Sequence, residues 1–130
     1  MATASETNGA FSWNELLTTD VAAARKFYGQ LFAWQFKDMP MGESTYTVVS
    51  AGGTDIGGIM HTPPAAKGMP STWGAYVTVD NVDARATQAK KLGGEVLVPP
   101  TDIPGVGRFA VIQDPQGATI SMITYARGRA

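Results

Sequence analysis

Few residues of this sequence could do chemistry. Of its 130 residues none is a cysteine, and His61 is the only histidine. The composition therefore excludes disulfides, thiolate catalysis and metal sites built on cysteine. The other candidate is Glu15, which stands among largely apolar neighbours in a predicted strand. A carboxylate in such a place is costly to bury unless it is paired or protonated.

Both candidates have a structural interpretation beside a functional one. Glu15 could form an ion pair with Arg108 or Arg25, or it could act as a general base. His61 ends the run GGIMH next to a proline-rich segment, so it could be an exposed or hydrogen-bonded loop residue, or a ligand or base. The structural interpretation is favoured for both residues, and Glu15 remains the candidate catalytic residue.

The overall composition narrows the classes of partner. Ten Lys and Arg against eleven Asp and Glu give a net charge of −1, so the chain has no broad basic field for nucleic acid. No apolar run is long enough to span a membrane. The start MATASETNGA lacks the basic and apolar regions of a secretory signal. We therefore expect a cytoplasmic protein that binds neither nucleic acid nor membrane.

The elements that must position these residues are written twice. At an offset of 60 residues, five residues of one stretch recur in another: Trp13, Thr18, Asp20, Ala24 and Arg25 match Trp73, Thr78, Asp80, Ala84 and Arg85. At an offset of 63, the run from Tyr46 to Met60 matches the run from Phe109 to Ile123 in its apolar positions. Such self-similarity indicates two copies of one supersecondary unit.

Each copy predicts a strand, a helix and three further strands. The opening strands run from Phe11 to Thr18 and from Trp73 to Val79. Asp20 and Asp80 stand where helix N-caps belong. The helices they begin, and the six later strands, are Val21 to Phe32, Val82 to Leu92 with its stop at Gly93-Gly94, Trp34 to Lys37, Tyr46 to Ser50, Ile56 to His61, Glu95 to Val98, Arg108 to Gln113 and Thr119 to Tyr125.

These elements predict an α+β protein made of two βαβββ modules that form one domain. We expect a flexible tail over residues 1–10, the first module over 11–62, a linker over 63–72 and the second module over 73–126. The segment Pro99 to Gly107 is expected to be a long irregular loop, of the kind that often carries binding residues.

The paired modules resemble the vicinal oxygen chelate superfamily, which includes glyoxalase I, bleomycin-resistance proteins, fosfomycin-resistance enzymes and extradiol dioxygenases. The resemblance covers about residues 11 to 125 and is closest to the small single-chain glyoxalase-like members. It rests on the opening W-x-E-L-x-T-x-D, followed by Phe27-Tyr28, Val79-Asp80-Asn81, Gly93-Gly94 and Asp114-Pro115-Gln116-Gly117. It implies two curled mixed sheets around a cavity, and pairing of such chains as homodimers.

The resemblance also implies four metal-ligand positions that face the cavity. In this sequence they are occupied by Trp13, Gly58, Gly74 and Ser121, none of which is a normal metal ligand. Shifting the register by one residue does not provide a better set. We therefore expect no metal and no other cofactor.

Strand alternation predicts which other side chains would face the same cavity. Trp13 is joined by Glu15, Gly58 by Ile56 and Met60, and Gly74 by Tyr76 and Thr78. The expected pocket has aromatic walls, two hydroxyls, a flexible apolar side chain and one carboxylate, from Trp13, Tyr76, Thr78, Ser121, Met60 and Glu15. Such a lining is typical of small-molecule sites and is also compatible with a plain core.

The sequence therefore predicts a metal-free protein that binds a small organic molecule in the cavity between the modules. The alternative is a glyoxalase-like lyase or isomerase with a shifted metal site, or with Glu15 as the base and Tyr76 or Ser121 holding the oxyanion. A third interpretation makes the cavity structural and the dimer surface the functional part.

Overall fold

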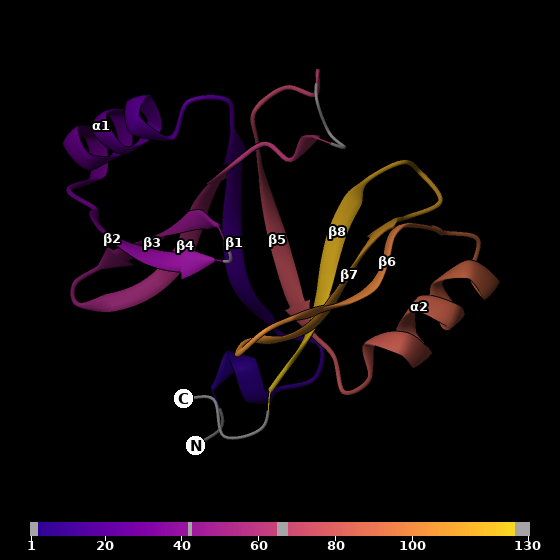
Figure 1. The fold of residues 1–130 in the computed structure, drawn as a ribbon. Helices are drawn as coiled ribbons and strands as arrows, with labels where there is room; N and C mark the ends of the chain where they lie inside the picture. The colour runs from indigo at the N-terminus through magenta and orange to yellow at the C-terminus, as the bar shows by residue number, and fades with distance from the viewer. Residues whose placement is uncertain (1–2, 42, 65–67, 127–130) are drawn as a thin grey trace. The chain divides into compact units, whose positions relative to one another are not determined.

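A computed structural model describes residues 3–41, 43–64 and 68–126 of the chain (Figure 1). After a short 3-10 helix, the order strand, helix, strand, strand, strand occurs twice, which confirms the two predicted βαβββ modules. The elements are η1 (Ala4–Glu6), β1 (Phe11–Thr18), α1 (Val21–Phe32), β2 (Gln35–Met41), β3 (Ser44–Ala51), β4 (Thr54–His61), β5 (Thr72–Thr78), α2 (Val82–Lys91), β6 (Glu95–Ile103), β7 (Gly107–Gln113) and β8 (Thr119–Tyr125).

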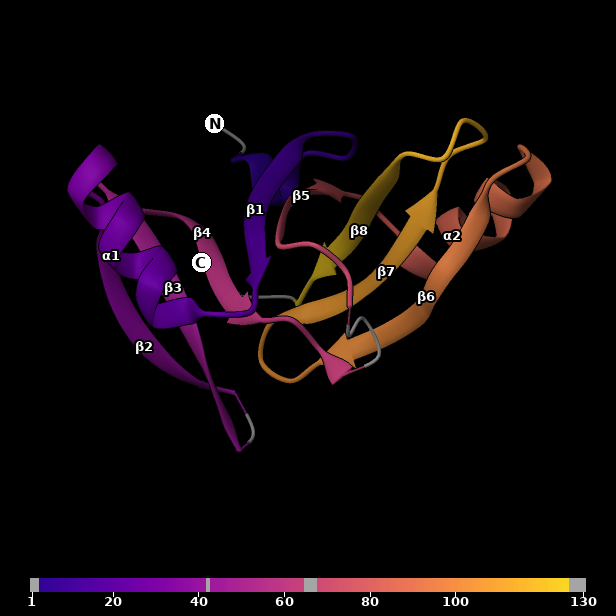
Figure 2. The same cartoon turned by 90° about the horizontal axis from the view of Figure 1, so that it is seen from above.

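The described residues form two compact units. The first unit is Trp13–Gly74, and the second contains residues 3–12 and 75–126. Strand order is β2-β3-β4-β1 in the first unit and β5-β8-β7-β6 in the second. In each, the opening strand is parallel to the last strand of its module and the other neighbours are antiparallel. Figure 2 shows that both sheets are twisted and curled, as the predicted α+β class requires.

The core of the first unit lies between its sheet and α1. Leu16, Val49 and Ile59 are buried, and Tyr28 of α1 and Trp34 pack against them. Asp20 caps the helix as predicted, because its side chain accepts a hydrogen bond from the Ala23 amide at 2.9 Å. No helix in the described part of the chain is long and apolar enough to cross a membrane.

The core of the second unit lies between its sheet and α2, and its centre is formed by Val79, Val82, Ala86, Ala110 and Met122. The prediction of Asp80 as the N-cap of this helix is wrong. Asn81 caps it, because α2 begins at Val82 and the Asn81 side chain accepts from the Ala84 amide at 3.0 Å. The predicted stop is confirmed, since Gly93 has a positive φ of 94°.

The position of this cap shows that the two modules correspond with an offset of 61 residues at their start, not 60. Glu15 is paired with Gly58 across β1 and β4, and Tyr76 is paired with Ser121 across β5 and β8. Tyr76 therefore corresponds to Glu15, and Gly74 corresponds to Trp13. The identity between Trp13 and Trp73 is out of structural register by one residue, which in a strand places the two side chains on opposite faces.

The segment from Pro99 to Gly107 is not the irregular loop that its prolines suggest. β6 continues through it to Ile103, and only residues 104–106 form the turn to β7. β6 is the edge strand of its sheet, where a proline without an N–H group is tolerated. Irregularities in the pairing with β7, between Val96 and Val98 and between Val98 and Thr101, accommodate the change of backbone.

Residues 3–10 lie in the segment for which the sequence predicts a flexible tail. Their described structure contains η1 and a short pairing with β5. The Gly9 amide donates to the Thr78 carbonyl at 2.7 Å, and the Thr78 amide donates to the Ala10 carbonyl at 2.8 Å. These hydrogen bonds belong to the second unit.

Candidate functional site

The predicted cavity residues of the first unit share one face of its sheet. Trp13 and Glu15 are two residues apart on β1, so their side chains leave the same face. Gly58 is the Cα partner of Glu15 on β4, and Met60 is the partner of Leu17. Leu16, between them on β1, faces the opposite way into the core under α1. The alternation expected for these residues agrees with the register of the strands.

A tyrosine from β3 joins Trp13 and Glu15 on this face. The Trp13 Nε1–H group donates to the Tyr46 hydroxyl at 2.9 Å, and the Tyr46 hydroxyl donates to Glu15 Oε2 at 3.0 Å. All three side chains are half-buried. We call Trp13, Tyr46 and Glu15 the hydrogen-bonded trio. Sequence reasoning missed Tyr46, although two glycines in a buried strand are a signal that a neighbouring group comes close.

The two glycines of β4 are explained by what lies against each of them. A side chain at Gly58 would overlap the Tyr46 phenol, whereas a side chain at Gly57 would run into the backbone carbonyl of Asn14. Both residues are buried. Close approach therefore accounts for the glycine pair, and the Tyr46 hydroxyl fills the space that a side chain at the family's ligand position would need.

The trio does not fit a divalent metal ion. The indole N–H of Trp13 is only a donor and Gly58 has no side chain, which leaves Glu15 as the one strong anionic ligand of this face. The described residues contain no group of three or more His, Asp or Glu side chains able to hold a metal. His61 is exposed at the end of β4, and its Nδ1 lies 2.9 Å from the Thr62 carbonyl oxygen.

The arginines considered as partners of Glu15 have acidic partners of their own. Arg25 pairs with Asp38 at 2.7 Å. Arg108 pairs with Asp83 at 2.9 Å and with Asp102 at 3.0 Å. The printed partner of the Glu15 carboxylate is thus a neutral phenol that donates a hydrogen bond, an arrangement that can hold a carboxylate in a fixed orientation.

The predicted cavity residues of the second unit form a less polar group. Tyr76 is buried beside Ser121, and its ring centroid lies 6.5 Å from that of Phe109 on β7. The Thr78 hydroxyl donates to the Ala4 carbonyl at 2.8 Å, so it contributes to fixing the segment before β1. Gly74 is exposed on β5, within the first unit.

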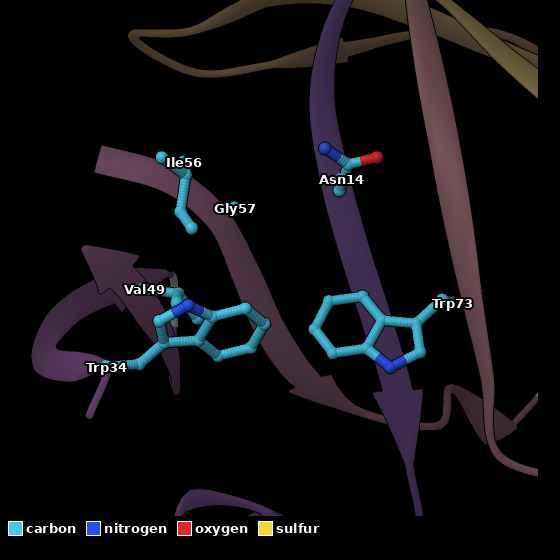
Figure 3. A pocket seen from close by; sticks show the side chains of 6 residues that line it. All are labelled: Asn14, Trp34, Val49, Ile56, Gly57 and Trp73. Carbon is cyan, nitrogen blue, oxygen red and sulfur yellow. The ribbon is translucent and has the colours of Figure 1, made fainter. Parts of the chain in front are cut away.

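A pocket of 320 Å³ lies on the opposite face of the first unit's sheet (Figure 3). It is lined by Asn14, Trp34, Val49, Ile56, Gly57 and Trp73. The expectation that Ile56 shares a face with Gly58 is wrong. The pairing of β3 with β4 shifts between Val49 and Ser50, where Val49 pairs with Gly57 but Ser50 pairs with Asp55, and the extra residue Ile56 faces the pocket.

Comparison with known proteins gives one consistent result. Residues 10–122 match the family model of the Glyoxalase/Bleomycin resistance protein/Dioxygenase superfamily. The chain is 41% identical over 126 residues to a protein of Mycobacterium tuberculosis (strain CDC 1551 / Oshkosh) named "Putative glyoxylase CFP32", covering 96% of this chain and 48% of that protein. It is 34% identical over 127 residues to the anthracycline biosynthesis protein DnrV of Streptomyces peucetius, covering 88% and 46%. The chain thus spans about half the length of these curated relatives.

Solved structures agree on the fold. The methylmalonyl-CoA epimerase of Mycobacterium tuberculosis superposes with a TM-score of 0.64 at 13% identity, covering 97% of this chain and 93% of that one. A methylmalonyl-CoA epimerase in complex with methylmalonyl-CoA and ammonium gives a TM-score of 0.65 at 15% identity, with coverages of 95% and 99%. At these identities the likeness concerns the fold alone.

Proposed function

Because the chain belongs to the Glyoxalase/Bleomycin resistance protein/Dioxygenase superfamily, we propose that it binds a small organic molecule, without a metal, at the face that carries the hydrogen-bonded trio. The observation that carries this proposal is the position of the Tyr46 hydroxyl. It lies where a side chain at Gly58 would stand, and it joins Trp13 to Glu15. A polar network with aromatic walls has replaced the set of ligands.

The chemistry of this face supports a molecule with both apolar and polar parts. The indole of Trp13 and the ring of Tyr46 offer apolar surface, and Met60 offers a flexible side chain beside them. The Glu15 carboxylate is an acceptor whose orientation is fixed by Tyr46. An aromatic compound that carries a hydrogen-bond donor suits this lining. The name of DnrV, which links that relative to anthracycline biosynthesis, is in line with an aromatic ligand.

The first test is native mass spectrometry and elemental analysis of the purified full chain. The proposal expects a co-purified organic mass or an empty protein, and no stoichiometric transition metal. The same spectra report whether the chain is the predicted homodimer. A tightly held zinc, nickel, iron or manganese ion at one per chain would contradict the metal-free site.

The second test locates binding with the chain's own tryptophans. A thermal-shift screen of aromatic and glycopeptide compounds provides hits, and each hit is titrated into ¹⁵N-labelled protein. A ligand of the proposed site should move the indole N–H signal of Trp13. Trp13→Phe keeps a ring but removes the donor, and we expect at least about a threefold loss of affinity. Trp73→Phe is the matched control, and an equal loss there would contradict the assignment.

A second candidate function, a lyase or isomerase, is favoured by one specific observation. Glu15 is a carboxylate held by the Tyr46 hydroxyl on an aromatic face, which is a suitable place for a general base. Such a base would take a proton from a carbon next to a carbonyl group and return it to a neighbouring atom, so that no oxidant or reductant is needed. The relatives named as glyoxylases are compatible with this chemistry.

Activity would be assayed with methylglyoxal and glutathione, with and without added divalent metals. If turnover is found, Glu15→Gln should reduce kcat by at least about a hundredfold, because a general base typically contributes that much or more. Turnover that survives Glu15→Gln would exclude the metal-free mechanism. Turnover that depends on added metal would instead support a shifted metal site.

A further inference from the structure

A second ligand site lies on the opposite face of the strands that carry the trio. We propose that the pocket lined by Trp34, Trp73 and Asn14 binds a neutral, planar aromatic molecule of one or two rings that carries a hydroxyl or amide group. The pocket lies entirely within the first unit. Its residues alternate along β1 and β4 with Trp13, Glu15 and Gly58, so the two sites are back to back across one layer of sheet.

Two indole rings determine the shape of the ligand. Trp34 and Trp73 have ring centroids 5.9 Å apart and planes at 76° to one another. In Figure 3 they reach toward one another from opposite sides of the pocket. A flat ring placed between them can lie against the face of one indole while it meets the edge of the other. Both arrangements are favourable for aromatic pairs, whereas a branched aliphatic group would gain only burial.

The two indoles are held in place before any ligand arrives. The Trp73 Nε1–H group donates to the Tyr28 hydroxyl at 3.1 Å, and the ring of Tyr28 stacks on Trp34 at 5.6 Å. Trp73 nevertheless leaves 39% of its surface exposed and Ile56 leaves 36%. A rigid aromatic wall that remains accessible costs little entropy to use, which favours binding.

Asn14 supplies the polar end of the site. Asparagine is a poor strand former, yet Asn14 stands in the middle of β1, and its carboxamide makes no hydrogen bond with any other residue in the described ranges. The carboxamide offers both a donor and an acceptor, so it can pair with a hydroxyl or an amide. None of the six lining residues is charged, which favours a neutral molecule. A volume of 320 Å³ is at the lower end for small-molecule sites, so the ligand is small.

The chain's three tryptophans make this proposal separable from the proposed function. We would titrate 2-naphthol into the ¹⁵N-labelled full chain and follow the three indole N–H signals, assigned with single Trp→Phe variants. The inference expects the Trp34 and Trp73 signals to move together while the Trp13 signal stays in place. Movement of Trp13 alone would overturn the inference and leave the trio as the binding site. No movement at millimolar 2-naphthol would also overturn it, without bearing on the other face.

Two variants then test the individual parts of the pocket. Asn14→Leu removes the polar group, and we expect the affinity for 2-naphthol to fall about three- to tenfold. Ile56→Trp fills the pocket and should abolish binding. Leu97→Trp is the matched control, because Leu97 is also an exposed apolar strand residue, at 46%, but lies on β6 in the second unit. Undiminished binding by a folded Ile56→Trp protein, judged from its amide spectrum, would contradict the proposed site.

Discussion

The two units carry different side chains at equivalent positions of the same βαβββ module. Where the first unit has Glu15 paired with Gly58, the second has Tyr76 paired with Ser121. Tyr46 of β3 corresponds to Phe109 of β7, because each stands two residues before the partner of that glycine or serine. The first unit therefore presents a carboxylate in a hydrogen-bonded network, and the second presents two aromatic rings next to a serine.

This comparison assigns a specific role to one glycine. Gly58 allows the Tyr46 phenol to lie against β4, where it reaches both Trp13 and Glu15. Ser121 has a side chain at the equivalent place, and Phe109 has no hydroxyl to form such a network. The same backbone thus carries two chemistries, and the difference depends on four side chains rather than on the fold.

The largest expected effect comes from removing that glycine. In Gly58→Ala the new methyl group overlaps the Tyr46 phenol, so the ring must move and both of its hydrogen bonds to the trio are lost. We expect the free energy of unfolding to fall by about 2 to 3 kcal/mol. Urea denaturation of the full chain measures this change.

A double-mutant cycle separates the overlap from other effects of the substitution. With Tyr46→Ala in the background, Gly58→Ala should cost much less, because the phenol is no longer there. Gly74→Ala is the matched control in a strand, since the nearest atom to an added methyl there is a Glu15 carbonyl oxygen at 4.0 Å. Equal costs at Gly58 and Gly74 would show that the close approach of Tyr46 is not what requires the glycine.

Exchange of the two β-strand aromatics sharpens the comparison further. Tyr46→Phe removes one hydroxyl, so that Trp13 and Glu15 both lose this partner, and the free energy of unfolding should fall by about 1 to 2 kcal/mol. Phe109→Tyr adds a hydroxyl at the corresponding position of the second unit, where no such network exists to receive it. We expect no gain in stability from Phe109→Tyr in the same urea experiment, and a gain equal to the loss at Tyr46 would contradict the assigned difference.

Much of the fold could be predicted because its signals are local. The bounds of β1, α1 and β8 agree with the sequence prediction to the residue, since alternation, a capping Asp20 and helical periodicity mark them directly. The same alternation placed Trp13 and Glu15 on one face and Leu16 on the other. Local patterns of this kind are set by neighbours along the chain.

The parts that could not be predicted depend on pairing between distant strands. Tyr46 reaches the trio only because β3 is in a particular antiparallel register with β4, and a shift in that pairing turns Ile56 to the other face. The position of Pro99 in a strand depends on β6 being an edge of its sheet. Whether the equivalent modules align at 60 or 61 residues also changes every face assignment in β5, and only the pairing of Tyr76 with Ser121 decides it.

The one-residue change of alignment leads to a prediction of intermediate size. If the modules correspond at 61 residues, Asp20 and Asn81 are equivalent caps, and replacing either by Ala should lower the free energy of unfolding by about 1 kcal/mol. Asp80→Ala, the residue that the identity pattern selects, should cost less than half of that, because it removes only a 3.5 Å ion pair with Arg85. Thermal melts of the three variants would reverse the alignment if Asp80→Ala were the most harmful.

The smallest expected effect concerns an ion pair that has no counterpart described in the first unit. Arg108 of β7 donates to both carboxylate oxygens of Asp83 on α2, at 2.9 and 3.1 Å, and these hydrogen bonds lower the pKa of Asp83 below its ordinary value of 3.8. A lowered carboxyl pKa means that the stabilisation is present above about pH 4 and is lost as the pH falls through the lowered pKa. Both groups are exposed, so the effect is small. The urea midpoint of Asp83→Asn should lie slightly below that of the unaltered chain at pH 7, and the gap should close near pH 2. Arg108→Lys keeps the charge but not the paired donors, and it should show most of the same loss at pH 7 if geometry matters more than charge.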